Sequence, residues 1–250
     1  MTTNPRIQNL PLLIASILLI TSGCLAPTPK TLTNPLPRVS AMATDPPPPT
    51  ATASPAPTPT ATTIPLPLNI PPLKQRLTTP VNLPGGQQDY GTSNCSIAVL
   101  SMALTYYKSI GAIPPTSTSD YPSLIRVFRA STPPQQQLSP DLTLLPSLSG
   151  NKLSAAVWSI APEELEELIK MELSAGNPVM LPVSGNLLAA QWPWTNAHMV
   201  LINGILPTGV VQYLDPWDGA QYQQPLPDLI KAALPIGNGT EVILARFILR

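Results

Sequence analysis

Charge and histidine are both scarce in this chain of 250 residues. Charged side chains make up 10% of the sequence, and 13 basic residues balance 13 acidic ones. A chain without net charge has no long-range field that attracts phosphates, so we expect no nucleic acid as a partner. One histidine and two cysteines are too few for the nitrogen and sulfur ligand sets that hold zinc.

Long hydrophobic runs are also scarce, and the one that stands out lies at the N-terminus. A single charge, Arg6, is followed by an apolar run from Leu10 to Ile20 and then by small residues up to Cys24. The run is too short to span a bilayer, and its order of segments is typical of a secretory signal peptide. We therefore interpret residues 1–24 as a signal peptide and place the chain outside the cytoplasm.

The end of this segment resembles the lipobox of bacterial lipoproteins, because Cys24 directly follows Ser22 and Gly23. The resemblance implies that Cys24 is acylated and becomes the mature N-terminus, anchored to the cell membrane by lipid. Thr21 replaces the leucine usual at the start of that box. The alternative is an ordinary secretory signal, in which Cys24 is removed or is only a helix residue.

Proline is abundant instead, with 35 residues concentrated between Ala26 and Pro84. From residue 25 to residue 78 the sequence is mostly Pro, Thr and Ala, with almost no side chain that could anchor a core. Such a composition favours polyproline II and resists collapse. About 50 residues of this kind can extend over about 100 to 150 Å. We interpret residues 25–78 as a stalk and residues 79–250 as the one folded domain.

Two helices are well marked in that domain. The first runs from Pro162 to Ala175, because proline suits the first helical position, Glu163 and Glu164 complement the dipole, and Gly176 ends the helix. A second helix begins near Cys95, with Ser93 or Asn94 as its cap, and ends at Gly111. A shorter helix starts at Asp120 and continues through Phe128. The rest of residues 116–157 shows no pattern that assigns an element.

Four apolar runs predict strands: Val179 to Val183, Ala197 to Ile205, Gly209 to Leu214 and Glu241 to Leu249. Pro182 in the first of them favours an edge strand or a bulge, because proline cannot donate to a ladder. Helices followed by several strands, rather than a strict alternation, indicate an α+β domain.

Cys95 would lie in the first turn of its helix. Unpaired backbone N–H groups and the helix dipole stabilise a thiolate there, which makes Cys95 a candidate nucleophile. The alternative is a small buried hydrophobic residue. An unpaired thiol is unusual in an exported protein, and a lipidated Cys24 could not be its disulfide partner.

His198, the sole histidine, stands at the start of one predicted strand, and Asp215 ends the next. With Leu206 and Pro207 at the centre of the hairpin, these two residues would face each other across the ladder. A carboxylate beside an imidazole orients the ring and stabilises its charged form, as in a nucleophile–base–orienter triad. A slip of one residue would put Asp215 on the other face. Alternatively, His198 is a structural histidine and Asp215 belongs to a turn.

At these residues the sequence resembles a known family. Gln87 to Tyr107 (QQDYGTSNCSIAVLSMALTYY) is similar to the nucleophile segment of the bacteriocin-processing cysteine peptidases, which cut double-glycine leaders, and above all to their extracellular stand-alone relatives. The segments LIKMELSAGNPVMLPV, AHMVLINGI and VVQYLDPWDG follow in the family's order. The resemblance implies a papain-like cysteine peptidase fold, with the Cys-bearing helix packed on an antiparallel sheet that carries His and Asp.

Carried over to this chain, the resemblance implies Cys95 as nucleophile, His198 as general base and Asp215 as orienter. It also implies an oxyanion-hole donor at Gln87 or Gln88, and the two adjacent glutamines leave that choice open.

The sequence departs from the family directly after the nucleophile, where Ser96-Ile97 stand in place of the usual Gly-Pro. This difference leaves catalytic activity open. Asn94-Cys95-Ser96 also resembles the Asp-Cys-Ser start of bacterial cell-wall endopeptidases, another papain-like family. That family has glycine at the position of Ile97 and brings its histidine much sooner.

The predicted function is a cell-surface cysteine peptidase or amidase that cleaves a peptide-like bond through a Cys95 acyl-enzyme and uses no cofactor. Its expected partners are the membrane lipid anchor and a peptide or protein substrate, with cell-wall peptide among the candidates. The alternative from another class is a catalytically silent papain-like module that binds peptide or wall material. A cell-wall endopeptidase of the related family is the second enzymatic alternative.

Overall fold

The computed structural model describes residues 67–136, 139–192, 197–236 and 241–250. The predicted signal peptide, the lipidation site at Cys24 and the stalk up to residue 66 lie outside these described residues. Among the helices of the described part, none has the length and apolar character needed to cross a membrane.

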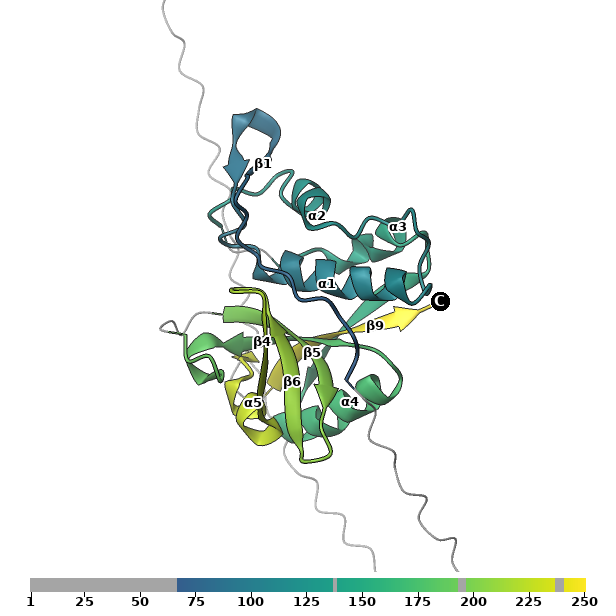
Figure 1. Cartoon of the computed structure of the whole chain (residues 1–250), viewed down its shortest axis with the longest axis vertical. Coiled ribbons are helices and arrows are strands. Elements are labelled where there is room, and N and C mark those ends of the chain that lie inside the picture. The colour runs from purple at the N-terminus through teal and green to yellow at the C-terminus, as the bar shows by residue number, and fades with distance from the viewer. Residues whose placement is uncertain (1–66, 137–138, 193–196, 237–240) are drawn as a thin grey trace, which may run out of the picture. The chain divides into compact units, whose positions relative to one another are not determined.

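The fold is α+β, built on an antiparallel sheet, as the sequence predicted (Figure 1). The main sheet has the strand order β3-β9-β4-β5-β6-β7, and β8 pairs with β9. Its strands are β3 (Leu153–Ile160), β4 (Val179–Ser184), β5 (Ala197–Ile205), β6 (Val210–Asp215), β7 (Ala220–Pro225), β8 (Pro235–Ile236) and β9 (Glu241–Leu249). A separate pair is formed by β1 (Val81–Asn82) and β2 (Gln88–Asp89).

Helices cover both faces of this sheet. The helices are α1 (Cys95–Ser109), α2 (Tyr121–Phe128), α3 (Leu145–Leu148), α4 (Pro162–Ser174) and α5 (Leu226–Ala232), and short 3₁₀ turns occupy Pro84–Gly86, Leu142–Leu144 and Gly185–Leu187. In Figure 1, α1 lies against one face, with α2 and α3 outside it, and α4 and α5 lie against the other. The two faces therefore bury two separate apolar clusters.

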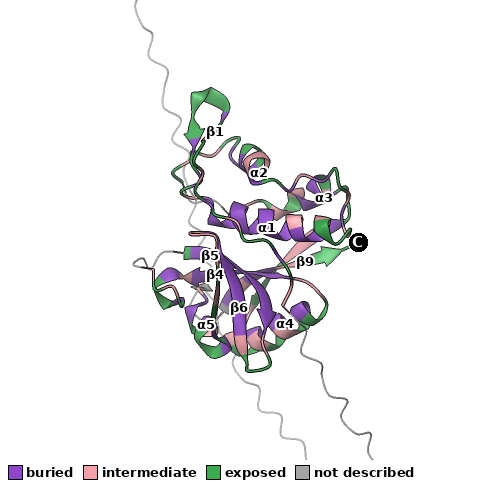
Figure 2. Cartoon of the chain, in the orientation of Figure 1, coloured by how far each residue is buried: buried purple, intermediate pink, exposed green. Residues whose placement is uncertain are grey.

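The central helix α1 is buried over most of its length (Figure 2). Its C-terminal end is fixed by hydrogen bonds from Tyr106 Oη to the carbonyl of Gly176 (3.1 Å) and from Tyr107 Oη to Asn177 Oδ1 (3.1 Å). The ring of Tyr107 also packs edge-on against Phe247. These contacts fix α1 relative to the sheet, and thereby fix its first residue, Cys95.

Strand β4 corrects one prediction. The strand is not at an edge, because it lies between β9 and β5, and the structure shows no bulge at Pro182. The Pro182 carbonyl accepts a hydrogen bond from Leu234 N (3.0 Å), so its nitrogen faces away from β5 as well. The pairing of β4 with β9 covers only Val179 and Met180. Pro182 therefore interrupts no ladder hydrogen bond, which is why an interior strand accepts it.

The folded part begins before residue 79, where the sequence placed the end of the stalk. Leu68 N donates to the Asn203 carbonyl (2.7 Å), and Ile70 is 4% exposed within the core. A Cβ atom at Gly204 would come within 2.7 Å of Pro67, so only glycine admits this close passage. The predicted boundary at residue 79 is too late in the chain, because Leu68, Ile70 and Leu73, which lie among the prolines of residues 67–73, pack against the apolar cluster on the α1 face of the sheet.

Candidate active site

Cys95 is the first residue of α1, where the sequence predicted it. The side chain is a free thiol and only 8% exposed. Asn94 occupies the N-cap position, and its side chain is fixed by Asp89 and Arg129 rather than by a cap hydrogen bond to α1. The positive end of the α1 dipole and the first backbone N–H groups of the helix therefore lie at the sulfur.

The pairing of β5 with β6 differs from the predicted register. The hairpin is centred on Thr208 rather than between Leu206 and Pro207, and a bulge at Asn203 then moves the pairing by one residue, so that continuing the observed pairing to the end of β6 places Asp215 opposite Val200. Asp215 is thus not directly opposite His198, as we predicted, but diagonal to it. Because the offset is two residues, both side chains still lie on the same face of the sheet.

His198 and Asp215 are in direct contact. His198 Nε2 donates to Asp215 Oδ1 over 2.7 Å, and both side chains are buried. Asp215 accepts two more hydrogen bonds, from Trp192 Nε1 to Oδ2 (2.8 Å) and from the Trp217 backbone N–H to Oδ1 (2.9 Å). The carboxylate is therefore held in one orientation by three donors, and its position fixes the tilt of the imidazole.

The electrostatics of this group favour a charged imidazole. Burial lowers the pKa of His198, but Asp215, through its hydrogen bond and charge, and Cys95 outweigh it and raise that pKa to about 9. Burial raises the pKa of Asp215, but the hydrogen bond and charge of His198, with the donors Trp192 and Trp217, bring it below its usual value. At neutral pH the pair is an imidazolium and a carboxylate.

Cys95 lies close enough to His198 for its thiol to act on the pKa of the imidazole, although no hydrogen bond found among the described residues joins the two side chains. Since Asp215 occupies Nε2, Nδ1 is the ring nitrogen left for the thiol. The structure therefore brings together the three residues that the sequence selected, from α1, β5 and β6.

The two glutamines are less closely placed. Gln87 and Gln88 are both exposed, and Gln88 Oε1 accepts a hydrogen bond of 3.4 Å from Tyr90 Oη. Among the described residues, no hydrogen bond or ion pair joins either glutamine to Cys95. The structure therefore does not choose between them as an oxyanion-hole donor.

A third glutamine, Gln75, lies closer to the site and was missed. It is 2% exposed, its Nε2 donates to the Thr92 carbonyl (3.1 Å) and its backbone N donates to the Pro216 carbonyl (2.6 Å). It thereby links the loop before Cys95 to the turn after Asp215. No local signal marks Gln75, because it lies within the proline-rich stretch assigned to the stalk.

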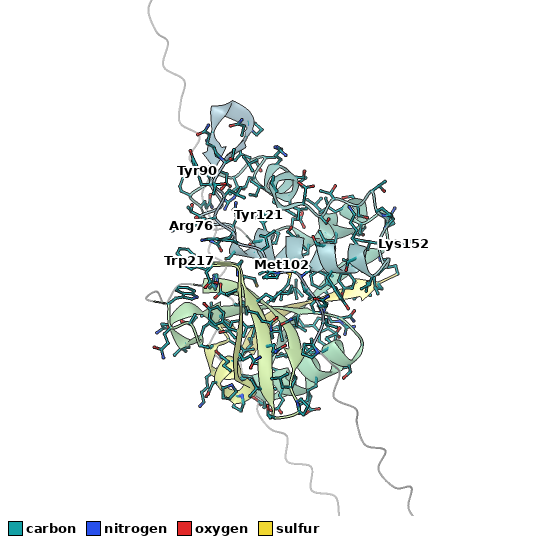
Figure 3. The ribbon with its side chains drawn as sticks, viewed as in Figure 1. Arg76, Tyr90, Met102, Tyr121, Lys152 and Trp217 are labelled. Atoms are coloured by element: carbon teal, nitrogen blue, oxygen red, sulfur yellow. The ribbon has the colours of Figure 1, made fainter. Side chains whose placement is uncertain are left out.

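Two tryptophans surround the carboxylate, and they were also missed. The rings of Trp192 and Trp217 lie 6.2 Å apart. The guanidinium of Arg76 lies over the Trp217 ring at 4.5 Å (Figure 3). These rings limit the access of water to Asp215 and so strengthen its hydrogen bond to His198. Only Trp217 had a sequence signal, as part of the segment that ends β6.

An apolar groove of about 490 Å³ lies on the α1 face of the sheet beside β5. Met199, the residue after His198, forms part of its wall. Other apolar residues of the wall are Ala155, Val157, Met180, Pro182 and Ala245. The groove has room for apolar side chains of a peptide.

No metal site emerges from the described residues, which hold no group of three or more His, Cys, Asp or Glu side chains able to bind an ion. No protein-family model matches the chain, and a search of curated proteins finds no match either.

Proposed function

We propose that the folded part is a papain-like thiol hydrolase, a peptidase or amidase that uses Cys95, His198 and Asp215. The observation that carries the proposal is the buried imidazole of His198, bonded to Asp215 at 2.7 Å and close to the thiol that begins α1, which acts on its pKa. A nucleophile beside a base that is bonded to an orienter is what acyl transfer requires.

In the acylation step, the Cys95 thiolate attacks the carbonyl carbon of the substrate and forms a C–S bond. The oxyanion that develops faces the N-terminal amides of α1, which stabilise it. The imidazolium of His198 then gives its Nδ1 proton to the leaving nitrogen as the C–N bond breaks. The products of this step are an amine and a thioester on Cys95.

In the deacylation step, the neutral imidazole accepts a proton from water while the water oxygen attacks the thioester. The C–S bond breaks, the acid leaves, and the thiolate–imidazolium pair is restored. Asp215 accepts the Nε2–H bond throughout, so it fixes the ring and stabilises each imidazolium. Neither step draws on a cofactor.

The proposed substrate is a peptide or protein segment outside the cell. The groove beside Met199 is apolar, which suits aliphatic or aromatic side chains of a bound peptide. The predicted signal peptide, a lipid on Cys24 and the stalk would hold the enzyme at the membrane surface.

Turnover tests the proposal directly. A fluorogenic peptide library with apolar residues at varied positions is incubated with the wild type and with Cys95→Ala. We expect cleavage by the wild type alone, and an acyl-enzyme mass on the Cys95 peptide after quenching. Equal cleavage by Cys95→Ala would refute the thiol mechanism.

A second candidate is a catalytically silent module that binds peptide or wall material. The 8% exposure of Cys95 favours it, since a nucleophile must reach its substrate, and so does Ser96-Ile97 after the cysteine. This module would bind the peptides found in the library screen without cleaving them. Release of soluble peptides from purified cell wall would instead favour the related cell-wall endopeptidases.

A further inference from the structure

A buried ion pair lies beside the nucleophile and outside the triad. Arg129, the residue that ends α2, is 1% exposed, and Asp89, in β2, is fully buried. Arg129 Nε lies 3.4 Å from Asp89 Oδ2. Burying two charges costs free energy that an ion pair alone often fails to recover, so the role of this pair calls for explanation.

The guanidinium of Arg129 connects the residues before Cys95 to a second loop. Its Nη2 donates to the Ser93 carbonyl (2.9 Å), and Nε donates to Asn94 Oδ1 (2.7 Å), which also accepts from Nη2. Its Nη1 donates to the carbonyls of Pro133 (2.9 Å) and Gln136 (2.5 Å). The planar five-donor group thus holds the two residues that immediately precede Cys95.

Asp89 completes the same framework from the other side. Its Oδ2 accepts from Asn94 Nδ2 (2.9 Å), and its Oδ1 accepts from the Gly91 backbone N–H (2.6 Å). Gly91 has φ +79°, and a Cβ there would overlap the Gln75 carbonyl oxygen. The turn between Asp89 and Cys95 is therefore fixed by charge-assisted hydrogen bonds along its length.

Burial brings the pKa of Arg129 below its usual value, and the charges of Asp89, Tyr121 and Cys95 oppose that effect. The carboxylate of Asp89, 3.4 Å from Arg129 Nε, is the first of the charges that compensate the buried guanidinium.

From this geometry we infer that Arg129 is a positioning residue, which holds the Ser93–Asn94 turn so that α1 begins at Cys95. The inference rests on the proposed function. It assigns to the end of α2 the placement of the proposed nucleophile.

Alkylation of Cys95 tests this role without a substrate. The full chain is treated with iodoacetamide from about pH 5 to 9, and modification is followed by mass spectrometry on the peptide that contains Cys95. The variants are Arg129→Met, which removes the charge, and Arg129→Lys, which keeps the charge but not the fork. Arg126→Met is the matched control, because Arg126 is exposed on the same helix.

For Arg129→Met we expect the rate of Cys95 alkylation to fall about tenfold, because the turn before Cys95 is no longer held. Arg129→Lys should react about threefold more slowly than the wild type at its plateau, because an ammonium has three donors and lacks the planar fork that holds the four acceptors, which are Asn94 Oδ1 and the carbonyls of Ser93, Pro133 and Gln136. Arg126→Met should match the wild type. A wild-type profile in Arg129→Met, or an equal change in Arg126→Met, would overturn the inference.

The NMR signal of His198 serves as the folding control. If Arg129→Met does not fold, the Arg129→Lys variant tests the inference in its place. A wild-type plateau rate of Cys95 alkylation in Arg129→Lys would refute the positioning role. If wild type and His198→Ala share one profile that rises only near pH 8 or above, the proposed function fails and the inference fails with it. If reactivity at low pH depends on His198 but not on Arg129, only the inference fails.

Discussion

Replacement of Asp215 by asparagine should lower the pKa of His198 sharply. The structure raises this pKa to about 9 from an ordinary value of 6.5, which corresponds to about 3 kcal/mol in favour of the imidazolium. Asparagine keeps the size of the side chain and one acceptor oxygen but removes the charge. The burial that opposes the charged ring remains. We therefore expect the pKa of His198 in Asp215→Asn to fall to about 6.5 or below.

The measurement is unambiguous because the chain contains one histidine. A protein purified without a histidine tag gives a single imidazole C–H signal, whose chemical shift is followed by NMR from about pH 5 to 10. Asp218→Asn is a suitable control, because Asp218 accepts hydrogen bonds from Tyr222 Oη (2.5 Å) and the Ala220 N–H (3.0 Å), not from His198. That variant should titrate like the wild type.

Two results would refute this reasoning. A wild-type midpoint at or below 6.5 would mean that burial outweighs the partners of His198, so that the imidazole is neutral at pH 7. An unchanged midpoint in Asp215→Asn would mean that the contact of 2.7 Å does not hold the proton.

Three further predictions follow from the site and the sequence. Because the pKa of His198 is higher in the folded than in the unfolded state, its contribution to stability is complete below about pH 6.5 and is lost as the pH rises to about 9. Between pH 6 and pH 10, the free energy of unfolding measured in urea should therefore fall by about 3 kcal/mol more in the wild type than in His198→Gln. Equal losses in the two proteins would contradict this prediction. Cys95→Ala and His198→Ala should each remove nearly all turnover, whereas Asp215→Asn should lower kcat in a protein that still folds but melts at a lower temperature, because the stabilisation of the His198 imidazolium is lost; steady-state kinetics and calorimetry measure both effects. Globomycin, which blocks cleavage of lipoprotein signals, should make the uncleaved precursor accumulate on immunoblots, and unchanged processing would leave an ordinary signal or an uncleaved anchor.

Local sequence signals predicted much of the fold. The bounds of β5 and β9 agree with the predicted strands, and α4 begins at Pro162 as expected. Helix α1 begins at Cys95 and ends close to Gly111, because capping and apolar periodicity act within one or two turns. Strand β3 was missed, since it is an edge strand without a regular alternation of apolar and polar residues.

The three candidate catalytic residues could also be selected from the sequence, although their geometry could not be predicted. Cys95, His198 and Asp215 are marked by their chemistry and by the ends of their elements. The centre of the hairpin at Thr208 and the bulge at Asn203 together set the true register, and no local pattern indicated the bulge. The prediction that His198 and Asp215 lie on the same face of the sheet still holds, because the register was wrong by two residues, which is the period of side chains along a strand.

The sequence by itself therefore determined the helices and strands that carry the three candidate catalytic residues, those residues themselves and the expected export signal. Only the tertiary structure decided which buried polar groups support the site. Gln75, Trp192 and the pair of Asp89 and Arg129 come from segments distant in sequence, and many of their partners are backbone atoms. Every residue except proline offers both a backbone N–H and a carbonyl group, so the sequence does not show which backbone group a buried polar side chain will bond. These pairs are known only from the folded structure.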